Sequence, residues 1–140
     1  MKKEIEFRRP STLIKRIRHD GEKVHPLSKY PTSHNCGIWE HKMTFDTMMY
    51  HSLVSYGVIP AAYFEDEKTR YIKITVEPHD LTQTTRRHIY AFVREYAPPK
   101  RAEQIIKAMR KQFTLSPNGA NVAGHPAYVV KFDLDTAVEG

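Results

Sequence analysis

The chain has 140 residues and a formal net charge of +6 at pH 7, and 40% of its residues are hydrophobic. This hydrophobic content is too high for a disordered chain, and the length is sufficient for one domain with its own core. The longest uncharged apolar run, 47–64, is shorter than a bilayer span and contains Gly57 and Pro60. We therefore expect a single globular domain over residues 1–140, and we exclude a membrane protein.

The single cysteine, Cys36, cannot form an internal disulfide. Segment 1–9 does not resemble a cleavable signal peptide, because its lysines are followed by Glu4 and Glu6. Both observations favour a reducing compartment, so we expect the protein in the cytoplasm.

The first two thirds of the chain predict strands around one helix. Apolar and polar residues alternate over 1–30, which predicts three short strands with a hairpin turn at Asp20-Gly21. The spacing of apolar residues from Ile38 to Val54 predicts a core helix that ends at Gly57. Segments 58–64 and 70–76 predict a β-hairpin whose acidic tip is 65–67.

The last third predicts two helices and a strand. The helices lie within 82–113 and are separated by Pro98-Pro99, with Asp80, Thr82 or Thr84 as the cap of the first. Each helix has one apolar stripe, and segment 127–134 predicts a final buried strand. The predicted fold class is therefore α+β, with a mostly antiparallel sheet and about three helices packed on it.

The net positive charge is concentrated on the two predicted helices. Segment 82–113 holds eight Lys and Arg residues against Glu95 and Glu103, whereas the other 108 residues hold fourteen of each sign. A local surplus of this kind attracts phosphates. We therefore predict a nucleic-acid-binding face, DNA or RNA, that consists of Arg86, Arg87, Tyr90, Arg94, Lys100, Arg101, Lys107, Arg110 and Lys111.

Two readings compete with this prediction. A basic helix face also serves simply as a solvated surface. Alternatively, the chain is a protein–protein interaction module, such as an adaptor, inhibitor or assembly component, in which the same face meets an acidic partner. Aromatic residues such as Trp39 and Tyr90 would then be the anchors.

The sequence contains no catalytic motif that stands on its own. His34, Cys36, His41 and His51 are residue types that bind zinc, but no CxxC pair or HxxxH motif orders them. We therefore predict no metal site, no cofactor and no catalytic residue, and we expect a binding protein more than an enzyme. A phosphodiester-cleaving enzyme that uses His34, His41 and His51 is the remaining alternative.

Overall fold

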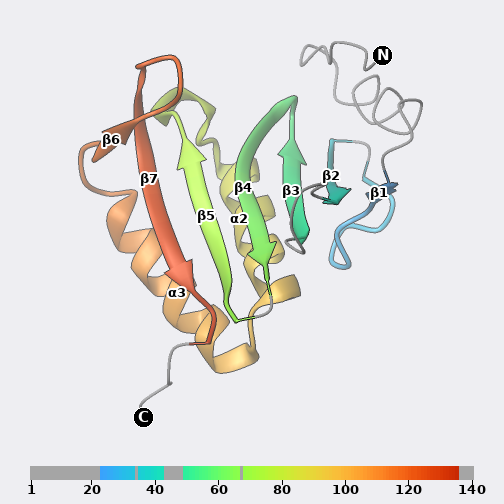
Figure 1. Ribbon diagram of the computed structural model, residues 1–140. Helices are drawn as coiled ribbons and strands as arrows, with labels where there is room; N and C mark the ends of the chain where they lie inside the picture. Colours follow the sequence, from blue (N-terminus) through green and yellow to red (C-terminus); the bar gives the residue numbers. More distant parts are fainter. Residues whose placement is uncertain (1–22, 34, 43–48, 67, 136–140) are drawn as a thin grey trace.

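The computed structural model describes residues 23–33, 35–42, 49–66 and 68–135, so the strands predicted within 1–22 lie outside this range. The described strands form one antiparallel sheet in the order β1-β2-β3-β4-β5-β7-β6 (Figure 1). They are β1 (Lys23–His25), β2 (Cys36–Lys42), β3 (Met49–Ser55), β4 (Val58–Glu65), β5 (Arg70–Val76), β6 (Gly119–Ala120) and β7 (Pro126–Asp133). The predicted α+β class with an antiparallel sheet is confirmed.

The predicted helix over 38–54 is wrong, because its described residues belong to strands β2 and β3. The two strands pair with Ile38 opposite Leu53 and with Trp39 opposite Ser52. Ile38, Trp39, Leu53 and Val54 are all buried, although neighbours in a strand point to opposite faces. Both faces are therefore covered, which removes the polar alternation that marks a half-exposed strand and leaves a spacing similar to that of a helix.

Gly57 belongs to a hairpin turn and does not end a helix. Tyr56 and Gly57 have φ angles of 48° and 80°, and Ser55 pairs with Val58 on either side of them. Positive φ at both central residues is what a two-residue type I′ turn requires. The chain therefore passes from β3 into β4 through this two-residue turn alone.

The predicted hairpin of 58–64 and 70–76 and the predicted final strand are confirmed as β4, β5 and β7. The part of the chain that the structure describes contains two α-helices rather than about three, α2 (Gln83–Tyr96) and α3 (Pro99–Gln112), and a short 3-10 helix, η1 (Pro78–Asp80). The Thr82 side chain accepts a hydrogen bond from the backbone N–H of Thr85, so Thr82 is the cap of α2.

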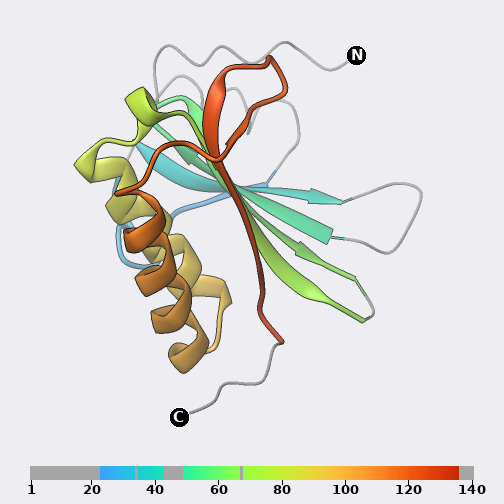
Figure 2. The ribbon, with the colours of Figure 1, turned by 90° about the vertical axis from the view of Figure 1, so that its left-hand side faces the viewer.

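Both helices lie on one side of the sheet (Figure 2), and the core lies between the two layers. The apolar stripes predicted for the helices are its main contribution: Ile89, Phe92, Val93, Ala102, Ile105, Ile106, Met109 and Phe113 are buried. Burying a large apolar side chain stabilises the fold by about 1.5–3 kcal/mol. Among the described residues, neither helix has the length and apolar character needed to cross a bilayer.

Candidate nucleic-acid interface

The structure describes all nine residues of the predicted interface, and all of them lie on α2 and α3. Seven are exposed: Arg86, Arg87, Arg94, Lys100, Lys107, Arg110 and Lys111. Tyr90 and Arg101 are half-buried. Most of the predicted cationic side chains are therefore exposed to solvent on the polar sides of the two helices.

Two contacts join the outer surfaces of the helices. The guanidinium carbon of Arg110 lies 5.3 Å from the centre of the Tyr90 ring, and an Nη2 nitrogen of Arg94 lies 3.2 Å from Oε1 of Glu103. The hydrogen bond from Arg94 lowers the pKa of Glu103 below its ordinary value. Tyr90 contacts Arg110, and Arg94 contacts Glu103, so the two helices run antiparallel. We call the line along which these two pairs meet the seam between the helices.

Arg101 is directed away from this seam. Its Nε donates a 2.8 Å hydrogen bond to the backbone carbonyl of Asp133 at the end of β7, and its Nη1 donates to the side chain of Gln104 at 3.2 Å. The guanidinium therefore fixes α3 to the sheet. We leave Arg101 out of the proposed interface for this reason.

Glu95, the second acidic residue of the two helices, forms its hydrogen bonds outside the helices. Ser28 donates its backbone N–H and its hydroxyl to the two carboxylate oxygens of Glu95, each at 3.0 Å. Glu95 thus ties the loop after β1 to α2. Among the described residues, only Arg94 of the seven exposed cations forms an ion pair.

The described members of the candidate histidine and cysteine group are not brought together. Cys36 pairs with Ser55, and His51 pairs with Glu40, which is four residues further along the same strand as Cys36. Four residues of a strand span about 13 Å, so one ion cannot contact both side chains. Burial raises the pKa of the Cys36 thiol. His34 and the side chain of His41 lie outside the described residues.

His51 instead belongs to a polar cluster between the sheet and the end of α2. Its Nδ1 lies 2.6 Å from the hydroxyl of Tyr96. Its Nε2 is buried without a hydrogen-bond partner among the described residues and lies 3.9 Å from Oε2 of Glu40. The same carboxylate oxygen lies 2.8 Å from Nε2 of His25. Burial lowers the pKa of His51. An imidazole in this position is poorly placed to reach a phosphodiester.

A buried network that the sequence analysis missed connects β3 to α2. The Ser55 hydroxyl lies 2.8 Å from Nδ1 of His88 and 3.2 Å from the Thr85 hydroxyl. All three residues are buried, and burial lowers the pKa of His88. Because Ser55 is fully buried, we assign this network to packing and not to nucleophilic catalysis.

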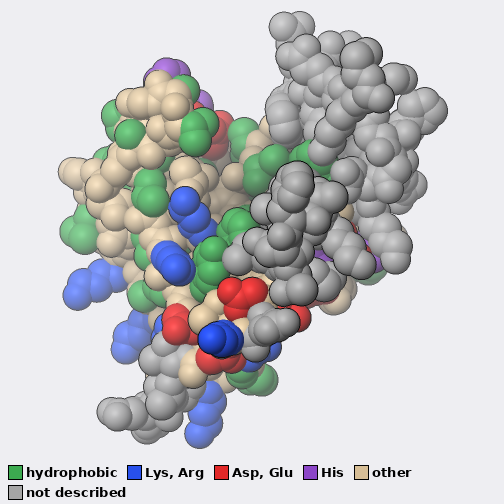
Figure 3. Space-filling view, viewed as in Figure 1, with side chains coloured by type: hydrophobic (Ala, Val, Ile, Leu, Met, Phe, Trp, Pro, Cys, Tyr) green, Lys and Arg blue, Asp and Glu red, His purple; other side chains and the backbone are tan. Residues whose placement is uncertain are grey.

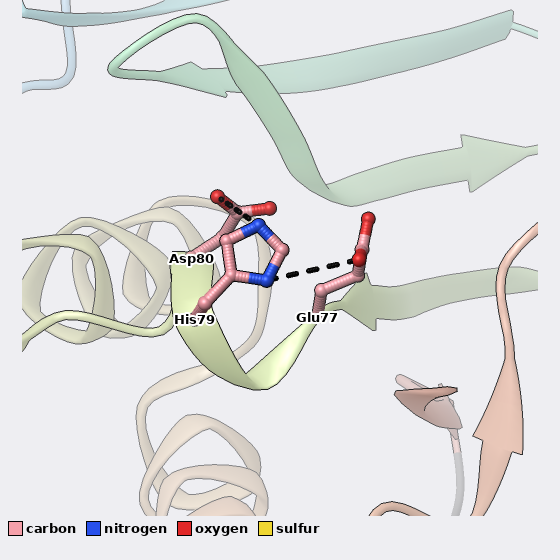
Figure 4. Close-up of side chains that lie close together, drawn as sticks. All are labelled: Glu77, His79 and Asp80. Atoms are coloured by element: carbon pink, nitrogen blue, oxygen red, sulfur yellow. Dashed lines mark ion pairs between the residues drawn. The ribbon is translucent and has the colours of Figure 1, made fainter. Parts of the chain in front are cut away.

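A second missed group lies at the opposite end of the sheet from His51. Glu77, His79 and Asp80 converge in and next to η1 (Figure 4), and one potential ligand atom from each lies within 4.8 Å of the other two. The signal in the sequence was the close spacing of three ligand types in Glu77-Pro78-His79-Asp80.

Comparison with protein-family models, with curated proteins and with solved structures finds no match to this chain.

Proposed function

We propose that the exposed face of α2 and α3 binds nucleic acid through its phosphates. The observation that carries the proposal is the gathering of seven exposed cations on two adjacent antiparallel helices, with Glu103 as the one acid paired to them among the described residues. A cationic surface of this density releases counterions when it meets a polyanion, which favours binding regardless of base sequence.

The spacing of the cations supports contacts with several phosphates. Lys100, Lys107 and Lys111 follow one side of α3 over about 16 Å, at 1.5 Å per residue. Arg86, Arg87 and Arg94 extend the face onto α2. The half-buried ring of Tyr90 lies at the seam and offers an aromatic surface among guanidinium groups.

The proposal includes a cytoplasmic location, because the one cysteine, Cys36, is a free and buried thiol. It also includes little preference among base sequences, since phosphate contacts position a protein without identifying bases.

A fluorescence anisotropy titration with labelled single-stranded and double-stranded oligonucleotides tests the proposal. If about six phosphates are neutralised, affinity falls by about 10³ between about 50 and about 200 mM salt. Affinity that does not respond to salt would reject the proposal.

A matched pair of double variants locates the surface. Lys107→Glu/Lys111→Glu reverses two charges on α3, and Lys73→Glu/Lys131→Glu reverses two exposed lysines that face each other across β5 and β7. Figure 3 shows the face of the sheet that lies away from the helices, with basic side chains over β5 and β7. We expect the α3 variant to weaken binding at least tenfold and the sheet variant to weaken it much less. Equal losses would mean that net charge, not this face, drives binding.

Competition with poly-glutamate separates nucleic acid from an acidic protein partner. Poly-glutamate of equal charge should displace the oligonucleotide poorly, because it offers no base that could stack on the ring of Tyr90. Equal displacement would favour the protein-interaction module.

A further inference from the structure

Three side chains of segment 77–80 meet where β5 leads through η1 into α2. The ring of His79 lies between two carboxylates: its Nδ1 is 3.8 Å from Oε1 of Glu77, and its Nε2 is 3.4 Å from Oδ1 of Asp80 (Figure 4). The short 3-10 helix places these ligand types within a few residues of one another.

A second segment brings a fourth potential ligand, another imidazole, to Glu77. His125, just before β7, has its Nδ1 3.4 Å from Oε1 of Glu77. Two imidazoles therefore approach the same oxygen of Glu77 from segments that are more than forty residues apart in the chain. The antiparallel pairing of β5 with β7, in which Val76 lies opposite Tyr128, makes this meeting possible.

Asn121 holds both sides of the cluster in place. Its Nδ2 donates to Oε2 of Glu77 at 2.9 Å, which leaves Oε1 for the imidazoles. Its Oδ1 accepts from the backbone N–H groups of Ala123 at 2.9 Å and His125 at 3.0 Å. Carboxylates that bind metals are themselves held by hydrogen bonds of this kind.

We propose that Glu77, His79, Asp80 and His125 bind a divalent transition-metal ion, with Zn²⁺ as the best match. Zinc is held by four ligands of this kind, imidazole nitrogen and carboxylate oxygen, at about 2.0–2.2 Å. Two nitrogen donors disfavour Ca²⁺ and Mg²⁺, which select oxygen. The side chains of His79 and His125 are 73% and 65% exposed, so both rings are free to close around an ion.

The cluster borders an open hollow of about 670 Å³. Glu77, Asp80 and Asn121 line it together with apolar residues that include Ile59 and Val122. Solvent or a small ligand in this hollow has direct access to the carboxylates.

The competing explanation is a set of surface ion pairs in which protonated imidazoles contact the two carboxylates. Such pairs require no metal and predict no saturable zinc binding at these residues. Isothermal titration of the full chain with zinc chloride, without nucleic acid, separates the two explanations, and its outcome is independent of the proposed function.

We expect one Zn²⁺ per chain in the wild type, and at least tenfold weaker binding in His79→Ala/His125→Ala. The isosteric variant Glu77→Gln should also weaken binding, which guards against a folding defect in the double variant. His25→Ala is the matched control, because it removes another exposed imidazole that contacts a carboxylate, that of Glu40, and it should bind zinc normally.

Cobalt gives a second readout with the same variants. Co²⁺ in a site with nitrogen and oxygen ligands absorbs visible light. The absorption band of bound Co²⁺ should be present in the wild type and in His25→Ala but absent from His79→Ala/His125→Ala. The proposal is overturned if the wild type shows no saturable zinc binding, or if the double variant and Glu77→Gln bind zinc as the wild type does.

Discussion

The guanidinium of Arg110 in α3 lies over the ring of Tyr90 in α2, 5.3 Å from the ring centre. The two residues are twenty positions apart in the sequence and meet because the helices fold back on each other at Pro98-Pro99. Arg86 and Arg94 lie four residues before and after Tyr90 on its own helix, so helix geometry places them on neighbouring positions of the same side. The tertiary structure adds a third guanidinium from the neighbouring helix.

This contact should contribute measurably to stability. In a double-mutant cycle with Arg110→Ala and Tyr90→Leu, urea unfolding should give a coupling free energy of about 0.5–1 kcal/mol, the range for an exposed cation–π pair. A parallel cycle with Lys111→Ala and Tyr90→Leu is the control, and it should give about 0.3 kcal/mol or less. Equal coupling in the two cycles would mean that the cation near Tyr90 acts through general charge and not through the ring.

Stability should fall on acidification because of buried histidine. Burial lowers the pKa of His88, so the folded chain binds this proton less readily than the unfolded chain does. The contribution of His88 is therefore complete above the ordinary imidazole pKa of about 6.5 and is lost as the pH falls below it. Burial also lowers the pKa of His51, so this residue adds to the loss of stability at low pH.

Urea unfolding at about pH 7.5 and about pH 5.5 checks this expectation. The wild type should be less stable at the lower pH. The variant His88→Asn removes the titrating ring and keeps a polar partner for the Ser55 hydroxyl, so it should lose less stability between the two pH values. If its loss equals that of the wild type, the buried ring of His88 is not the source.

The hydrogen bond between Tyr96 and His51 should stabilise the attachment of α2 to the sheet. Tyr96→Phe removes the hydroxyl that lies 2.6 Å from Nδ1, and Nε2 of His51 already has no hydrogen-bond partner in the described structure. A buried polar group without a partner costs about 1–3 kcal/mol, so the free energy of unfolding should fall by that amount.

Tyr71→Phe is the control for this variant. Tyr71 lies half-buried on the sheet face away from the helices and forms no hydrogen bond through its hydroxyl among the described residues. Loss of the Tyr71 hydroxyl should change the free energy of unfolding by about 0.5 kcal/mol or less. Equal effects of the two substitutions in thermal or urea unfolding would show that the bond to His51 provides no net stabilisation.

The two helices and β5, which the sequence predicted correctly, each have one buried and one exposed side. Helices α2 and α3 each bury one stripe, such as Ile105 and Met109, and expose the opposite one. In β5, Ile72 and Ile74 are buried whereas Lys73 between them is exposed. A single period is then visible in the sequence, 3.6 for a helix or 2 for a strand. Strands β2 and β3 were missed because Ile38 and Trp39 are both buried, so no such period remains.

The sequence by itself determined the local quantities: the surplus of cations in 82–113, the amphipathic stripes, and the break at Pro98-Pro99. These depend only on residues a few positions apart, and helix geometry converts them directly into faces. The tertiary structure alone decided which distant groups meet, as when Arg101 turns to β7 and His125 approaches Glu77. The physical reason is that strand pairing selects which loops share an end of the sheet, and the order of β5 and β7 follows from packing of the whole core rather than from any local pattern.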